Sequence, residues 1–341
     1  MKVLVTGTDG YIGVVLAPAL LERGHDVVGL DTGFFRDGWL YRAGNAKSPP
    51  CLNKDTRQVT VEDLRGFDAV VHLAELSNDP LGQLSTDVTL DINYKGSVGL
   101  ASKCKAAGVP RFVYSSSCSV YGVGSEEYKT EESPTNPQTA YSNCKVLVER
   151  ALSEMADDGF SPTCLRNATA YGPSPRMRFD LVLNNLCGWA WTTRQIRMTS
   201  DGTPWRPLIH VLDLCEAIAC ALEAPLDAVH NQVFNVGDNH ENYRVREIAE
   251  IVSHVFAGCE LMLGTSQGDN RSYRVSFDRI HSKLSGFRCR RTAKEGAIEL
   301  RELFDRIQMA RDTFESRAFT RLRQLEYLIK TNQIDNRFFW R

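Results

Sequence analysis

The sequence has almost no excess of either charge and contains no long apolar run. Its 341 residues carry 40 Lys and Arg against 42 Asp and Glu, so the formal net charge is -2. This balance gives no electrostatic reason to expect nucleic acid or an anionic membrane as a partner. No stretch approaches the roughly 20 consecutive apolar residues that a membrane span needs. We therefore expect neither nucleic acid nor a membrane among its partners.

Closely spaced cysteines are also missing. The ten cysteines are scattered, none forms a C-x-x-C pair, and no cluster of His and Cys has the spacing of a zinc site. We therefore expect no metal. In a chain of this length, scattered cysteines are typical of reduced and mostly buried thiols, which predicts a cytoplasmic location.

The composition is that of an ordinary globular protein, with 43% hydrophobic and 24% charged residues, and the length suits two lobes. In the first half, short apolar runs alternate with longer amphipathic ones. This alternation predicts an α/β fold, a doubly wound parallel sheet with helices on both faces. The expected strands are residues 3–6, 26–30, 68–73 and 111–115, and the expected helices are residues 11–22 and 94–107.

A run of helix breakers at 172–175 predicts a boundary between the two lobes. We expect residues 1–172 to form the first lobe, with the chain returning to it at 208–236. We expect residues 173–207 and 237–341 to form a smaller, mixed α/β lobe that binds substrate.

The second half has a weaker pattern. Residues 176–205 carry basic, aromatic and amide side chains in a poorly periodic order. A strand is expected at 233–237, and helices are expected at 246–256 and 294–311. The stretch 317–341 is rich in aromatic residues and arginine, and it either packs on the second lobe or covers a partner surface.

Three glycines, Gly7, Gly10 and Gly13, lie directly between the first expected strand and the first expected helix. Glycines at this position allow a tight turn, and they let backbone N–H groups approach a diphosphate at the helix N-terminus. An ordinary turn between a strand and a helix needs only one glycine. The run Thr6–Gly13 therefore predicts a Rossmann-type site for a dinucleotide.

Asp31 ends the second expected strand. A carboxylate there accepts hydrogen bonds from both ribose hydroxyls of adenosine and repels a 2′-phosphate, which favours NAD over NADP. A solvated turn residue is the alternative interpretation of Asp31. Arg36 lies close by in the sequence and is the residue that would instead pair with a phosphate.

A serine-rich strand end, residues 115–119, is followed about twenty residues later by Tyr141-Ser142-Asn143-Cys144-Lys145. On a helix, positions i and i+4 lie on one face, so Lys145 stands one turn from Tyr141 and lowers its pKa. Such a tyrosine takes a proton from a sugar hydroxyl while hydride leaves the same carbon. A lone Tyr-x-x-x-Lys is often a chance surface pair, but its place after a dinucleotide turn favours a catalytic role.

With these motifs in this order, the chain resembles the extended short-chain dehydrogenases/reductases of the nucleotide-sugar epimerase/dehydratase family. The resemblance implies a Rossmann lobe with tightly bound NAD, a smaller lobe that closes over an NDP-sugar, and a homodimer. It matches Ser117 to the catalytic serine or threonine of the family, Tyr141 to its base and Lys145 to the partner of that base.

The resemblance also implies a larger set of cofactor residues. Asp55 matches an acidic residue near the adenine, and Asn93 matches a helix asparagine that orders the active site. A cap on a turn and a bond to a neighbouring backbone are the alternative roles for these two. Glu75 departs from the family, which usually has alanine there. The implied cofactor residues are Gly7, Gly10, Tyr11, Ile12, Gly13, Asp31, Asp55, Leu73, Ala74, Asn93, Ser115, Tyr141 and Lys145.

Two arginines in the second half resemble the anion binders of the family. Arg206 lies in an R-x-x-x-H-V segment and Arg271 in a G-D-x-R segment, and a guanidinium suits a diphosphate. Surface salt bridges are the alternative. Thr169 stands where the family often has asparagine. The expected substrate residues are Ser117, Cys118, Ser119, Thr169, Arg178, Asn184, Arg206 and Arg271.

Three reactions use this arrangement of residues: epimerisation through a keto intermediate, 4,6-dehydration, and net oxidation or reduction. The dehydratases carry an Asp-Glu pair directly after the catalytic serine or threonine, whereas Cys118 and Ser119 stand here. Without a general acid the 6-hydroxyl is a poor leaving group, so we expect an epimerase. The alternatives are a sugar or NDP-sugar dehydrogenase or ketoreductase, an atypical dehydratase, and a non-catalytic dinucleotide sensor, although such sensors usually lose the tyrosine or lysine.

Overall fold

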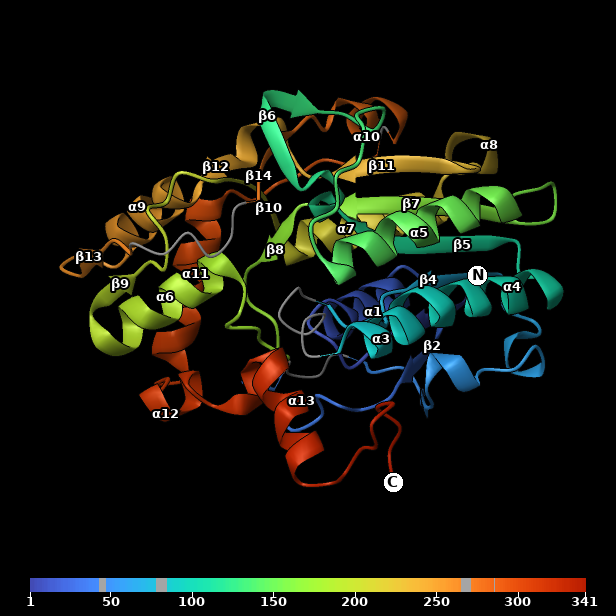
Figure 1. The fold of residues 1–341 in the computed structure, drawn as a ribbon, viewed down its shortest axis with the longest axis horizontal. Coiled ribbons are helices and arrows are strands. Elements are labelled where there is room, and N and C mark those ends of the chain that lie inside the picture. Colours follow the sequence, from blue (N-terminus) through green and yellow to red (C-terminus); the bar gives the residue numbers. More distant parts are fainter. Residues whose placement is uncertain (43–46, 78–84, 265–270, 285) are drawn as a thin grey trace.

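The computed structural model describes residues 1–42, 47–77, 85–264, 271–284 and 286–341. Its largest feature is a seven-stranded sheet with the order β11-β7-β5-β4-β1-β2-β3, in which every neighbouring pair is parallel (Figure 1). These strands are β1 (Lys2–Thr6), β2 (Asp26–Asp31), β3 (Cys51–Asn53), β4 (Ala69–His72), β5 (Arg111–Ser117), β7 (Ser161–Asn167) and β11 (Gln232–Val236). The expected α/β fold with a doubly wound parallel sheet is confirmed.

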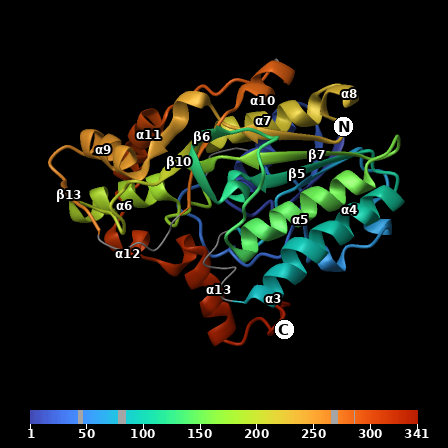
Figure 2. The ribbon, with the colours of Figure 1, turned by 45° about the horizontal axis from the view of Figure 1, so that its top comes forward.

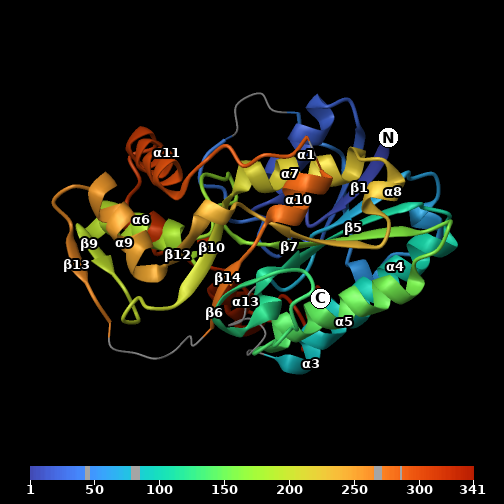
Figure 3. The same ribbon diagram turned by 90° about the horizontal axis from the view of Figure 1, so that it is seen from above.

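Helices cover both faces of this sheet (Figure 3). On one face α1 (Gly13–Glu22) packs against α7 (Val211–Glu223). On the other face α4 (Ser97–Ala106) and α5 (Ala140–Met155) lie side by side (Figure 2). Side chains of one strand alternate between the two apolar layers, which is the period of a strand buried on both faces.

The strand order reverses between β1 and β4, because the chain leaves β1 toward β2 and later returns to β4 on the other side. In open parallel sheets this reversal leaves a crevice at the carboxyl ends of the strands, where ligands bind. The π-helix η3 (Leu90–Gly96) precedes α4, so the helix expected at 94–107 begins earlier and with a wider turn.

Several of the remaining elements build a smaller mixed α/β region beside the sheet. Its three-stranded sheet has the order β12-β10-β8, and helices α6, α9 and α11 pack on one another. Two further strand pairs are β9 with β13 and β6 with β14. The strands are β6 (Val123–Lys129), β8 (Thr169–Tyr171), β9 (Gln195–Arg197), β10 (Trp205–His210), β12 (Asn242–Arg244), β13 (Glu260–Met262) and β14 (Ser272–Val275). The helices of this region are α6 (Val182–Thr193), α9 (Val245–Val255), α11 (Ala293–Arg306) and α12 (Arg311–Phe314). Three short helices instead contact elements of the first lobe: α3 (Thr86–Thr89) packs on α5, α8 (Leu226–Val229) on β7 and α10 (Asp278–Lys283) on β11. Helix α13 (Arg321–Lys330) belongs to the C-terminal segment.

Two expectations for the second half need correction. Residues 176–205 contain the twelve-residue helix α6, although their sequence gave no clear period. The helix expected at 294–311 ends at Arg306, because Gln308 adopts a left-handed backbone with φ 48. The N–H of Met309 then bonds the carbonyl of Phe304, which closes the helix end.

The C-terminal segment 317–341 contacts both lobes. Its start packs on the second lobe, as one expected alternative had it: the rings of Phe319 and Phe179 lie 5.8 Å apart, and the Phe179 N–H donates to the Phe319 carbonyl at 3.0 Å. The rest of the segment returns to the first lobe, which neither alternative covered (Figure 1). The indole N–H of Trp340 donates to the carbonyl of Thr32 at 2.6 Å. The amide of Gln324 donates to the carbonyl of Phe34 at 3.0 Å. Leu325 and Leu328 pack with Phe34 in a small apolar cluster. The segment is therefore fixed against the loop that follows β2.

Candidate active site

A cavity of about 870 Å³ lies at the carboxyl ends of β1, β4 and β5 and between the two regions of the fold. We call it the central cavity. Its size lies within the ordinary range of a cofactor or ligand site. The predicted cofactor residues that line it are Gly7, Gly10, Tyr11, Ile12, Gly13, Asp31, Asp55, Leu73, Ala74, Ser115, Tyr141 and Lys145. The predicted substrate residues that line it are Ser117, Ser119, Thr169, Arg178, Arg206 and Arg271.

The glycine turn is too closely packed for side chains at two of its positions. Gly7 has φ 76, and a Cβ atom there would lie 3.0 Å from the backbone nitrogen of Ala74. A Cβ atom on Gly13 would lie 2.1 Å from the carbonyl oxygen of Gly7. Helix α1 therefore begins directly against the turn, which leaves the backbone of the turn open to the cavity. This arrangement fits the diphosphate of a dinucleotide.

Asp31, at the end of β2, is held by two backbone donors. Its carboxylate oxygens accept the N–H of Asp9 at 3.0 Å and the N–H of Gly33 at 2.8 Å. Burial raises the pKa of Asp31, and these N–H donors oppose that rise. Asp55 also lines the cavity, but its oxygens already bind the backbone and guanidinium of Arg57 at 2.8 Å, so it caps a turn as well.

Tyr141 and Lys145 stand one turn apart near the start of α5. The helix begins with a capping box in which Thr139 and Ser142 bond each other's backbone N–H. Lys145 Nζ lies 5.4 Å from the centre of the Tyr141 ring and donates to the carbonyl of Ser115 at 2.5 Å. Ser117, the last residue of β5, accepts the N–H of Ser119 at 3.2 Å. Tyr141, Lys145 and Ser117 all line the central cavity.

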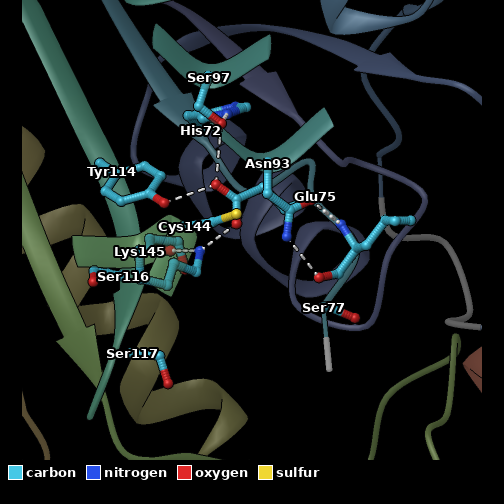
Figure 4. A network of polar contacts seen from close by, with 12 residues as sticks. His72, Glu75, Ser77, Asn93, Ser97, Tyr114, Ser116, Ser117, Cys144 and Lys145 are labelled. Atoms are coloured by element: carbon cyan, nitrogen blue, oxygen red, sulfur yellow. Dashed lines mark hydrogen bonds and ion pairs between the residues drawn. The ribbon is translucent and has the colours of Figure 1, made fainter. Parts of the chain in front are cut away.

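Glu75 adds a buried carboxylate to this group (Figure 4). Its Oε2 atom lies 2.7 Å from Lys145 Nζ, and both side chains are at most 5% exposed. Its Oε1 atom accepts hydrogen bonds from the Tyr114 hydroxyl at 2.7 Å and the Ser97 hydroxyl at 3.0 Å. Burial acts to lower the pKa of Lys145, but the Glu75 carboxylate, with a smaller contribution from Tyr141, opposes it and the pKa is raised. Lys145 is therefore a fixed cation.

The polar network continues behind Glu75 to a buried histidine. The ring of His72 bonds Ser97 through Nε2 at 2.8 Å and Thr6 through Nδ1 at 2.7 Å. Burial and, to a smaller extent, the nearby charge of Lys145 lower the pKa of His72 from 6.5 to about 3. The imidazole is therefore neutral at ordinary pH, which suits its place beside a cationic lysine.

Arg178 lies where the two regions meet. It forms two hydrogen bonds with the carboxylate of Asp180, at 2.9 and 3.0 Å, and donates to the Ser77 hydroxyl at 3.2 Å. Burial acts to raise the pKa of Asp180, but the Arg178 guanidinium outweighs it and the pKa is lowered. Asp180 also lines the cavity and was not among the predicted site residues. Its position two residues after an arginine was the only signal in the sequence.

Three predicted residues lie outside the lining of the central cavity as the structure describes it. Asn93 bonds both the N–H and the carbonyl of Leu76. These contacts match its alternative role, a bond to a neighbouring backbone. The Cys118 thiol donates to the carbonyl of Arg166, and burial raises its pKa. Asn184 accepts the N–H of Gly172 at 3.0 Å and donates to the Tyr11 hydroxyl at 3.3 Å, a contact that joins the two regions.

The described residues contain no group of three or more His, Cys, Asp or Glu side chains placed to hold a metal ion. All ten cysteines are free thiols. Among the helices that the structure describes, none combines the length and the apolar character of a membrane span.

Comparisons with known proteins agree with this geometry. The model of the NAD dependent epimerase/dehydratase family matches residues 3–237. A UDP-glucose 4-epimerase of Corynebacterium glutamicum is 32% identical over 274 residues, which are 75% of this chain and 80% of that protein. A UDP-glucose 4-epimerase of Bacillus subtilis is 28% identical, over 75% of this chain and 82% of its own length. The solved structure of MoeE5 in complex with UDP-glucuronic acid and NAD is 28% identical, has a TM-score of 0.77, and covers 90% of this chain and 99% of its own. The chain therefore belongs to the NAD-dependent epimerase/dehydratase family.

Proposed function

We propose that this protein is an NAD-dependent epimerase of a nucleotide-activated sugar, and that its substrate is a UDP-hexose altered at C4. The observation that carries the proposal is that Ser117, Tyr141 and Lys145 line the same cavity as the glycine turn. The relatives named UDP-glucose 4-epimerase support the nucleotide and the carbon.

The residues that would bind NAD line the cavity. The backbone of the glycine turn would hold the diphosphate, and Asp31 would hold the adenosine ribose hydroxyls. A carboxylate at this place favours NAD over NADP. Arg36, the residue that would favour NADP, lies over the ring of Trp340 at 4.9 Å. When bound, NAD supplies the acceptor for the sugar hydride.

The chain supplies the proton transfers and the fixed charges. Tyr141 takes the proton of the sugar hydroxyl, and Ser117 holds the same oxygen by a hydrogen bond. Lys145, kept cationic by Glu75, stabilises the tyrosinate form of Tyr141 that acts as the base, and proton uptake converts it to the neutral phenol. When the keto group has turned over, Tyr141 returns the proton to the oxygen. No net oxidation results, which distinguishes this reaction from that of a dehydrogenase.

The nucleotide part of the substrate would lie toward the smaller region. Arg206 and Arg271 line this side of the cavity, and a guanidinium matches the donor geometry that a diphosphate needs. Ser119, Thr169 and Arg178 would contact the sugar or its phosphate. Cys118 donates to a backbone carbonyl and leaves no acid beside Ser117, which disfavours dehydration.

Two further proposals concern the state of the protein. We propose a homodimer, which rests on the family resemblance, and sedimentation equilibrium tests it. We propose a cytoplasmic location, for which the ten free thiols are the support.

The experiment starts from the purified protein. Acid release of bound nucleotide measures retained NAD, and incubation with UDP-glucose or UDP-galactose is followed by chromatography of the two epimers. We expect retained NAD, interconversion and no net NADH. Net NADH would instead identify a dehydrogenase, and loss of water from the sugar would identify a dehydratase. Tyr141→Phe should reduce turnover at least about 100-fold while NAD stays bound.

A further inference from the structure

Arg321 brings a buried positive charge into the central cavity from the C-terminal segment. It is the first residue of α13, lines the cavity and is only 3% exposed. Its Nη2 atom has no hydrogen-bond partner in the described part of the chain. Its guanidinium lies 4.1 Å from the ring centre of Phe35. The side chain is thus placed firmly but leaves a donor unsatisfied.

The acidic groups near Arg321 are engaged with other donors. Asp31 accepts two backbone N–H groups, and Asp180 is held in the two-bond pair with Arg178. The pKa of Arg321 is lowered to about 9, first by burial and then by the charge of Arg178. Asp180 and Asp31 oppose this lowering but do not cancel it.

A buried guanidinium with an unused donor costs free energy, because water no longer solvates it and no anion replaces the water. The fold nevertheless holds Arg321 in this position. The amide of Gln324, one turn further along α13, bonds the carbonyl of Phe34 at 3.0 Å. Trp340 bonds Thr32 on the same loop. A charge kept in place at such a cost indicates an anionic ligand.

The neighbours of Arg321 identify the anion. The guanidinium lies over Phe35, directly after β2, and shares the cavity lining with Asp31 and the glycine turn. On this side the proposed function places the adenosine half of the dinucleotide. The Asp31 carboxylate would repel an added 2′-phosphate, which leaves the diphosphate as the anion within reach.

We propose that Arg321 binds a phosphate oxygen of the dinucleotide diphosphate, so that the C-terminal helix forms part of the cofactor site. This inference rests on the dinucleotide of the proposed function. It assigns a role to a segment that lies outside residues 3–237, which the family model matches. Cofactor binding is then coupled to the docking of segment 317–341 on the first lobe.

The test compares Arg321→Met and Arg321→Lys with wild type after removal of bound nucleotide, using calorimetric titration with NAD, NADP, ADP-ribose and adenosine. Arg323→Gln is the matched control, because Arg323 lies on the same helix, is exposed and donates to the carbonyl of Glu315. For Arg321→Met we expect the affinities for NAD and ADP-ribose to fall roughly 10- to 100-fold, the effect of a charged hydrogen bond. The affinity for adenosine should not change. Arg321→Lys should lie between wild type and Arg321→Met.

Thermal unfolding separates binding from folding. Arg321→Met removes an unsatisfied buried charge, so the nucleotide-free variant should melt at the wild-type temperature or above it, and NAD should raise its Tm less. A variant that melts lower but binds NAD as wild type does would overturn the inference. So would a loss confined to NADP, which would identify a 2′-phosphate contact. If wild type binds neither dinucleotide, the proposed function fails as well, whereas equal NAD binding by wild type and Arg321→Met refutes the present inference alone.

Discussion

The Nζ atom of Lys145 lies 2.7 Å from the Oε2 atom of Glu75, and the two groups form a buried ion pair beside the catalytic candidates. A lysine in such a pair has less freedom than a lone one. Its ammonium is fixed by the Glu75 carboxylate and by the carbonyl of Ser115. Glu75 therefore determines where the positive charge stands relative to Tyr141.

Replacing Glu75 with glutamine should lower the pH above which activity declines, which we call the alkaline limit of activity. The carboxylate is the main influence that raises the pKa of Lys145 against burial, so in Glu75→Gln the pKa of Lys145 falls. The lysine then loses its proton at a lower pH than in wild type. We expect kcat/KM to decline on the alkaline side at lower pH, and the measurement is a profile of kcat/KM against pH.

Glu154→Gln, an exposed change on the same helix α5, is the control for Glu75→Gln and should leave the profile unchanged. If the two variants have the same alkaline limit as wild type, Glu75 does not control the protonation of Lys145. A uniform drop in activity at every pH would instead indicate a role for Glu75 in folding alone.

We predict that the buried, neutral His72 makes the protein less stable in weak acid. Its pKa is lowered from 6.5 to about 3 in the folded protein, so between these values the unfolded chain binds a proton that the folded chain does not. The contribution of His72 to the free energy of unfolding is fully present above pH 6.5 and is lost as the pH falls toward 3. The expected slope is about 1.4 kcal/mol per pH unit in that window. Urea unfolding at a series of pH values measures it.

The comparison variant is His72→Gln, which cannot take up the proton and should show a shallower dependence between pH 6.5 and 4.5. His254→Gln, at an exposed position of α9, should keep the wild-type slope. Equal slopes for His72→Gln and wild type would show that the acid sensitivity has another origin.

The parts of this site that the sequence predicts are those whose residues lie close together in the chain. The glycine turn and the Tyr141–Lys145 pair depend on a strand end and on one helical turn, so their patterns are local. Arg321 meets Phe35 only because α13 returns across nearly the whole length of the sequence. No pattern in the sequence of segment 317–341 predicts that contact.

Helix α6 escaped prediction for a different physical reason. It packs against α9, α11 and α12, so apolar residues occur around most of its circumference and no single stripe marks it. Gly188 lies in its interior, and a Cβ atom there would lie 2.1 Å from the ring of Phe314. Close packing explains this glycine, which otherwise counts against a helix.

Replacing Gly13 with alanine should damage both the fold and the cofactor site. The added methyl group would lie 2.1 Å from the carbonyl oxygen of Gly7, and backbone on both sides must move to admit it. Overpacking of this kind costs about 1–3 kcal/mol. We expect a lower free energy of unfolding and weaker NAD binding, measured by urea titration and by retained NAD.

Gly99→Ala is the matched control, since Gly99 lies within α4 and a Cβ atom added to it would meet no atom of the described chain within 4 Å outside its own helix turn. Alanine favours helix over glycine by about 1 kcal/mol, so this variant should be as stable as wild type or more stable. Wild-type NAD retention in Gly13→Ala would contradict the close-packed turn.

Arg206→Gln should weaken binding of the nucleotide part of the substrate and leave NAD binding unchanged. Arg206 lies in β10, lines the central cavity and donates to the carbonyls of Trp205 and Arg271, so it also fixes the second arginine of the pair. A charged hydrogen bond to phosphate contributes about 1.5–3 kcal/mol. We therefore expect KM for the UDP-sugar and Kd for UDP to rise at least about tenfold.

Arg244→Gln, on the neighbouring strand β12, is the control for Arg206→Gln. It removes an exposed guanidinium that lies over the ring of Trp205 and should leave both constants near wild type. Equal UDP affinity in the two variants would place the diphosphate elsewhere in the cavity.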